Sequence, residues 1–198
     1  MDNRIDASKL QWKEIRTRHI VQNRWIDFRE SEFMFPDGTT FAPYYSYTRR
    51  DYALTVATDE EGRFICVRQF RQGISKVTTE FPAGGIETGG GDEYRKPDLR
   101  QALEAARREL EEETGFTADP GSWQHLITVP SCATISDNSA WVFAARNCRP
   151  RGQIKPDDTE FLATELHTRE EMEELIRNGD FEQSVHVMAY LLALRQTD

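Results

Sequence analysis

Three glutamates that share one face of a predicted helix are the side chains in this sequence best suited to chemistry. In the segment ALEAARRELEEETG (102–115), Glu109, Glu112 and Glu113 lie within five consecutive positions. At about 100° of rotation per residue, their carboxylates fall within an arc of about 100°. Like charges at this spacing repel each other, and the dipole near a helix C-terminus also disfavours anions. The arrangement is therefore costly unless a cation offsets it.

The predicted surroundings of this acidic face indicate which kind of cation that is. Leu99, Leu103, Ala106 and Leu110 form an apolar stripe beside it, so the edge of the acidic face turns towards the core, where carboxylates do not stay unpaired. Hard divalent ions such as Mg²⁺ take oxygen ligands and keep waters and substrate phosphates in their shell. The alternative interpretation is a solvated acidic face, which is common on helices.

The helix that carries the glutamates is predicted from its two ends. Asp98 and Gln101 have the spacing of a capping box, and Gly115 supplies a C-terminal stop after residues 99–114, which contain neither glycine nor proline. The glycine-rich stretch before the helix, PAGGIETGGGDEYRKP (82–97), is predicted to be a loop.

Strands are predicted on both sides of this helix, from aromatic and β-branched runs separated by turn signals. The predicted strands are 19–35, 39–48, 52–58, 63–70, 77–81, 123–129, 140–146 and 161–166. Two more helices are predicted near the C-terminus, one beginning with Thr168 and ending near Gly179, the other opened by Asp180 and Gln183. Strands mixed with helices in a chain of this length favour an α/β fold with a mixed sheet and helices on its faces.

Composition excludes several classes of protein. The 198 residues include 34 acidic and 25 basic side chains, a formal charge of −9, which argues against nucleic acid as a partner. No apolar run of about 18 residues predicts a membrane span, and the charged N-terminus does not look like a secretory signal. Three widely spaced cysteines argue against a disulfide framework. We therefore expect a cytoplasmic protein without membrane or nucleic-acid partners.

The helix and the loop before it resemble the Nudix hydrolase box, G-x5-E-x7-R-E-U-x-E-E-x-G-U, where U is a bulky apolar residue. RELEEETGF (108–116) matches the second half completely, and Gly85 corresponds to the leading glycine. Gly85 to Arg108 is 108 − 85 = 23 steps, against 14 in the pattern, so nine residues are inserted. The position of the first glutamate is Arg100, and Glu93 or Asp92 in the insertion is the candidate replacement.

Flanking motifs resemble the branch that hydrolyses ADP-ribose and other nucleoside diphosphosugars. They are RQFR (68–71), TEFPAGGIE (79–87) and DDTEF (157–161). This resemblance implies an α/β/α sandwich with a mixed β-sheet, preceded by a small N-terminal strand domain. The implied division is 1–49 for dimerisation and base binding and 50–198 for the Nudix hydrolase domain.

The resemblance also implies a Mg²⁺ site, with Mn²⁺ as the substitute ion, near the box helix. The implied ligands are the backbone carbonyl of Ala83 and the side chains of Glu109, Glu112, Glu113 and Glu160. Glu112, Asp158 and Glu160 are the catalytic candidates, and the choice of general base between Asp158 and Glu160 is open.

Substrate contacts implied by the resemblance come from earlier in the chain. Arg71 would hold a phosphate, and Arg50 would also contact the substrate. Arg68 and Arg71 lie on opposite faces of their strand, so only one of them is expected to meet phosphate. Trp25 and Tyr44, or Tyr45 in its place, fall where aromatic residues sandwich the nucleobase in related dimers.

These inferences predict an enzyme that hydrolyses the pyrophosphate bond of ADP-ribose to AMP and ribose 5-phosphate. Another nucleoside diphosphosugar, such as GDP-mannose or ADP-glucose, is the alternative substrate. A non-catalytic nucleotide-binding module is the alternative of a different class, because the first half of the box is disrupted. The N-terminal strands and the apolar last helix predict a homodimer.

Overall fold

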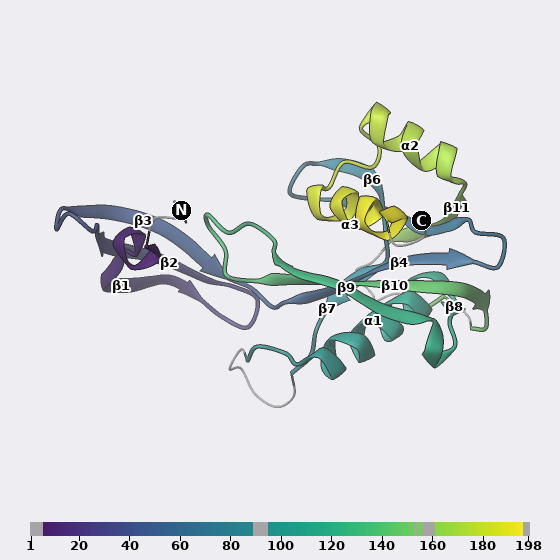
Figure 1. Cartoon of the computed structure of the whole chain (residues 1–198), viewed down its shortest axis with the longest axis horizontal. Helices are drawn as coiled ribbons and strands as arrows, with labels where there is room; N and C mark the ends of the chain where they lie inside the picture. Colours follow the sequence, from purple (N-terminus) through teal and green to yellow (C-terminus); the bar gives the residue numbers. More distant parts are fainter. Residues whose placement is uncertain (1–5, 89–94, 153, 156–160, 196–198) are drawn as a thin grey trace. The chain divides into compact units, whose positions relative to one another are not determined.

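The computed structural model describes residues 6–88, 95–152, 154–155 and 161–195 (Figure 1). These residues form two compact units. One contains the chain up to Arg50 together with Pro130–Asn138, and the other contains the remaining described residues. None of the helices among the described residues is long and apolar enough to cross a membrane.

The first unit is built on a three-stranded antiparallel sheet. Its strands are β1 (Lys13–Gln22), β2 (Asp27–Met34) and β3 (Thr40–Thr48), in that order across the sheet, and the short helix η1 (Ala7–Leu10) precedes them.

The prediction of a single strand over 19–35 is wrong, because a turn at residues 23–26 separates β1 from β2. The side-chain Oδ1 of Asn23 accepts hydrogen bonds from the backbone N–H groups of Trp25 (2.8 Å) and Ile26 (3.1 Å). Asparagine stabilises turns in this way by replacing a backbone acceptor. The aromatic residues around it therefore gave a misleading strand signal.

The second unit holds an eight-stranded mixed sheet. Its central order is β11-β5-β4-β10-β8, with β6 paired to β5, β7 to β4 and β9 to β10. β4 and β10 run parallel, whereas β5 is antiparallel to each of its three partners, β4, β6 and β11. The strands are β4 (Tyr52–Asp59), β5 (Phe64–Arg71), β6 (Lys76–Glu80), β7 (Ala83–Gly85), β8 (Phe116–Thr117), β9 (Trp123–Pro130), β10 (Ser139–Pro150) and β11 (Leu162–His167).

Helices cover both faces of this sheet, as Figure 1 shows. α1 (Leu99–Thr114) packs on one face, while α2 (Arg169–Asn178) and α3 (Ser184–Arg195) pack on the other. Successive residues of β4 point to opposite faces of the sheet: Ala53 packs against α1, and Leu54 packs in the core on the α3 side. The predicted α/β/α sandwich with a mixed sheet is confirmed.

The helix ends follow the local sequence signals in two of three cases. Asp98 and Thr168 each form a complete capping box, and Gly115 and Gly179 end α1 and α2 with positive φ. The third helix begins at Ser184, not at Asp180. The backbone N–H of Asp180 donates to the carbonyl of Leu175, so this residue lies just after α2 and caps its C-terminal end instead of opening α3.

Candidate metal and active site

Helix α1 carries the acidic face that the sequence predicts, and it buries two of the three carboxylates. Glu109 is 8% exposed and Glu113 is 1% exposed, whereas the side chain of Glu112 is 40% exposed. Buried Leu110 on the same helix packs with Ile65 of β5, which turns this edge of α1 towards the sheet. Carboxylates at this depth require partners.

Arg108 is the cation that bridges two of these carboxylates. Its Nη2 donates to Oε1 of Glu109 and its Nη1 to Oε2 of Glu112, each at 2.7 Å, and Nη2 also donates to the carbonyl of Gly85 (3.2 Å). Burial lowers the pKa of the Arg108 guanidinium, but the two carboxylates outweigh this effect and raise its pKa above the usual value. Arg108 therefore supplies one positive charge against three carboxylates.

The strand β7 brings the backbone of the glycine-rich motif against the acidic face. The N–H of Ala83 donates to Oε2 of Glu113 (3.0 Å). A Cβ atom on Gly84 would lie 2.0 Å from Cδ and Oε1 of Glu109, so only glycine allows this approach. β7 pairs with β4 through three residues. The sequence predicts only a loop here, because a strand of three residues gives no periodic pattern.

The donor set fits a hard divalent cation. The carboxylates of Glu109, Glu112 and Glu113 lie on one helix, and Glu113 accepts a hydrogen bond from the backbone of Ala83. Such oxygen ligands suit Mg²⁺. Within the described ranges, no group of three or more His, Cys, Asp or Glu side chains already converges in a metal-binding geometry. Glu160 and Asp158, and the candidate replacements Glu93 and Asp92, lie outside the described residues.

Arg71, the predicted phosphate ligand, is held by a fully buried carboxylate. Its Nε lies 2.8 and 2.9 Å from the two carboxylate oxygens of Glu80, and its Nη2 also donates to Glu80. Glu80 is 0% exposed, whereas the Arg71 side chain is 36% exposed. Arg68 contacts Thr79 instead (3.4 Å), as expected for residues on opposite faces of a strand. The partnership with Glu80 was not predicted.

The predicted base-binding residues belong to the first unit. Trp25 lies in the turn between β1 and β2 and not on a strand. It is 67% exposed, and the Arg24 guanidinium carbon lies 4.4 Å from its ring centroid. Tyr45 stacks on Phe28. Arg50 contributes its carbonyl to a hydrogen bond with Asn138.

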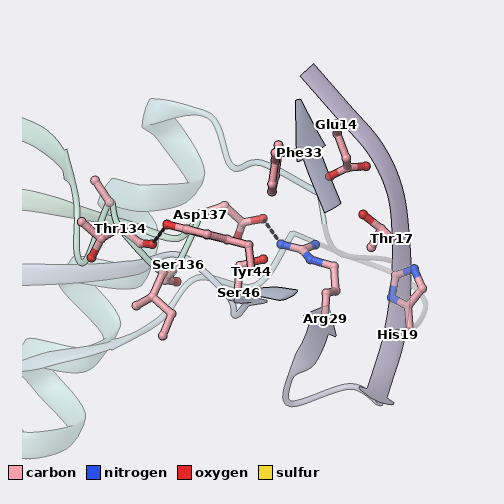
Figure 2. A pocket seen from close by; sticks show the side chains of 12 residues that line it. Glu14, Thr17, His19, Arg29, Phe33, Tyr44, Ser46, Thr134, Ser136 and Asp137 are labelled. Carbon is pink, nitrogen blue, oxygen red and sulfur yellow. Dashed lines mark hydrogen bonds and ion pairs between the residues drawn. The ribbon is translucent and has the colours of Figure 1, made fainter. Parts of the chain in front are cut away.

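Tyr44 lines a cavity of about 500 Å³ in the first unit, which Figure 2 shows. Its hydroxyl donates to the carbonyl of Thr134, and Arg29 across the cavity pairs with Asp137. Trp25 and Tyr45 do not line this cavity. The structure thus brings Tyr44 together with the 133–137 segment rather than with Trp25.

Comparisons with known proteins agree on the family and the fold. The family described as the NUDIX domain matches residues 48–186. An ADP-ribose pyrophosphatase of Bacillus subtilis is 34% identical over 110 residues, covering 55% of this chain and 53% of the relative. The chain thus spans about half the length of that relative.

Two further matches cover more of the chain. An ADP-sugar pyrophosphatase of Mus musculus is 29% identical over 72% of this chain and 67% of the relative. A crystal structure of an ADP compounds hydrolase superimposes with a TM-score of 0.75 at 20% identity, covering 94% of this chain and 95% of the other. At that identity the superposition shows that the two chains share a fold.

Proposed function

The chain belongs to the NUDIX family, and from that premise we propose that it hydrolyses the pyrophosphate bond of a nucleoside diphosphosugar. ADP-ribose is the leading substrate, with AMP and ribose 5-phosphate as products. The observation that carries this proposal is the acidic face of α1, where Glu109 and Glu113 are buried against the Ala83–Gly85 strand. Similarity to an ADP-ribose pyrophosphatase and an ADP-sugar pyrophosphatase supports the choice of substrate class.

The proposed cofactor is Mg²⁺, with Mn²⁺ as the substitute ion. The residues that would hold it are the Ala83 carbonyl, Glu109, Glu112, Glu113 and Glu160. When bound, Mg²⁺ supplies charge neutralisation and Lewis acidity towards the pyrophosphate oxygens. The chain's own contribution is to hold three carboxylates and one backbone segment together on α1 and β7, which keeps their spacing fixed.

The remaining roles concern proton transfer and phosphate binding. Asp158 or Glu160 would accept the proton of the attacking water, as a general base within hydrogen-bond reach does. Arg71 would donate hydrogen bonds to the pyrophosphate and stabilise the charge that develops on the departing phosphate. Arg108 would keep Glu109 and Glu112 in place, because it bonds to both.

For the N-terminal segment we propose dimerisation and base binding, with residues 1–49 serving both and 50–198 forming the hydrolase domain. The first unit exposes several large apolar side chains, a feature typical of interaction surfaces; they include Trp12, Ile15, Ile20, Val21 and Trp25. Trp25, Tyr44 or Tyr45, and Arg50 are the candidate substrate contacts. A monomeric mass by light scattering at micromolar protein would contradict the homodimer.

Hydrolysis of a substrate panel tests the proposal. The panel is ADP-ribose, ADP-glucose, GDP-mannose, UDP-glucose, NADH and diadenosine polyphosphates, each with and without Mg²⁺. We expect metal-dependent turnover that is fastest with ADP-ribose. If GDP-mannose or ADP-glucose is turned over fastest, that compound replaces ADP-ribose as the substrate, and the proposed substrate class stands. Tight ADP-ribose binding by calorimetry without turnover would favour the non-catalytic module instead.

A further inference from the structure

The buried carboxylate of Glu80 accepts hydrogen bonds from two side chains. Arg71 approaches it through Nε and Nη2, and the hydroxyl of Thr78 donates to Oε1. Burial raises the pKa of this carboxyl, but the hydrogen bonds and charge of Arg71 and the bond from Thr78 outweigh it, so its pKa lies below the usual value. Glu80 is therefore an anion enclosed in the protein, and a buried anion needs such a partner.

The pair lies on the face of the sheet that α1 covers. Residues 65, 67, 69 and 71 of β5 share one face because side chains alternate along a strand. Ile65 on this face packs with Leu110 of α1. Glu80 is paired in register with Val67, so it lies on the same face as Arg71.

Glu80 is also close along the chain to the acidic face of α1. Three residues after it, the N–H of Ala83 donates to Glu113, and between them the carbonyl of Pro82 accepts from the N–H of Thr55 (3.0 Å). The segment that connects the Arg71–Glu80 pair to Glu113 is therefore fixed at both of these points. This places Arg71 and the acidic face of α1 on one side of one sheet.

The two partners differ in their exposure. Glu80 is fully enclosed, whereas more than a third of the Arg71 side chain is open to solvent. A guanidinium held through one edge by a carboxylate loses less rotational freedom when it binds an anion through its exposed part. An ion pair of this kind suits the recognition of phosphate better than a mobile surface arginine does.

We infer that Glu80 is a positioning residue that holds the Arg71 guanidinium in the orientation that binds the substrate pyrophosphate. This inference rests on the proposed function and adds to it the residue that orients the phosphate-binding arginine. Thr78 supports the same arrangement through its bond to Glu80.

A double-mutant cycle on kcat and KM for ADP-ribose tests the inference. Glu80→Gln should lower kcat/KM about tenfold, mainly by raising KM, since a misplaced binding group weakens substrate positioning. In the Arg71→Gln background, the same change should alter kcat/KM by less than about twofold, because the group that Glu80 positions is already gone. An equal loss in both backgrounds would mean that Glu80 acts only on the fold, and this result would overturn the inference.

Milder variants keep the test decisive if Glu80→Gln unfolds. Thr78→Val removes one hydroxyl bond to Glu80 and should raise KM about fivefold, the equivalent of one lost hydrogen bond. Thr79→Val on the opposite face of β6 is the matched control and should leave KM unchanged, as should Arg68→Gln on β5. Equal effects of the Thr78 and Thr79 variants would overturn the inference.

The wild-type protein separates this inference from the proposed function. Absence of turnover by the unaltered protein would overturn both. If the unaltered protein turns over normally but the effects of Glu80→Gln and Arg71→Gln on kcat/KM are additive, the role of Glu80 is overturned and the proposed function stands.

Discussion

Replacing Gly84 by alanine should remove most of the hydrolytic activity while leaving the fold in place. A Cβ at this position would lie 2.0 Å from Cδ and Oε1 of Glu109 and 2.4 Å from Oε2. Carbon atoms pack at about 3.5 Å, so the carboxylate or the β7 backbone must retreat by about 1.5 Å. Glu109 is bonded to Arg108, which also bonds Glu112 and the carbonyl of Gly85. The displacement therefore spreads through the proposed metal site.

The expected size of the effect follows from that displacement. A shift of about 1 Å in a positioned catalytic group can cost about 100-fold in rate, so kcat/KM of Gly84→Ala should fall about 100-fold. Overpacking costs about 1–3 kcal/mol, and a melting experiment should show a folded protein with a modestly reduced Tm.

Gly85 provides a matched control one residue away. A Cβ on Gly85 would meet no atom within 4 Å, and alanine keeps the carbonyl that accepts from Arg108. Gly85→Ala should therefore retain activity within about threefold, since little changes at a surface position of this kind. Near-normal activity of Gly84→Ala, or an equal loss in both variants, would refute the packing of β7 against Glu109 as the basis of the site.

Three further predictions concern other residues. Glu113→Gln should lower kcat at least about 100-fold with the fold intact, as loss of a metal ligand does, whereas exposed Glu111→Gln should be almost silent; steady-state kinetics of both variants decides this. Asp51→Ala should lower the free energy of unfolding by about 3 kcal/mol in a denaturant titration. The buried carboxylate of Asp51 accepts hydrogen bonds from the backbone N–H of Ser139, the indole N–H of Trp141 and the ammonium group of Lys96. A decrease of less than about 1 kcal/mol would contradict this prediction. In a native thiol assay at neutral pH, exposed Cys132 should react, while Cys148, whose pKa burial raises to about 12, should not; modification of both at equal rates would contradict the described burial.

The parts of the fold that the sequence predicts well are those encoded within a few residues. Helix α1 is bounded by Asp98 and Gly115, and each of these makes its capping bond to a residue three or four positions away. The turn at 23–26 is not predicted from the sequence, because the surrounding aromatic residues favour a strand and the side chain of Asn23 alone stabilises the turn. The sequence predicts that the last helix opens at Asp180, four residues too early, because the end of α2 and the start of α3 are only a few residues apart.

The candidate site also combines features that the local sequence predicts with features that depend on tertiary contacts. The arc of Glu109, Glu112 and Glu113 follows from helix geometry alone, and the burial of two of them agrees with the apolar stripe beside it. The partnership of Arg71 with Glu80 depends on the register of β5 against β6, which no local pattern specifies. The union of residues 130–138 with the N-terminal strands likewise depends on tertiary contacts.

The most direct measurement of the central claim is the chromatographic analysis of ADP-ribose incubated with the protein and Mg²⁺. Equal amounts of AMP and ribose 5-phosphate should form, and no products should form when a chelator removes the metal or when Glu113 is replaced by Gln. Product formation that survives both the chelator and the Glu113→Gln change, or no product at any Mg²⁺ concentration, would contradict it.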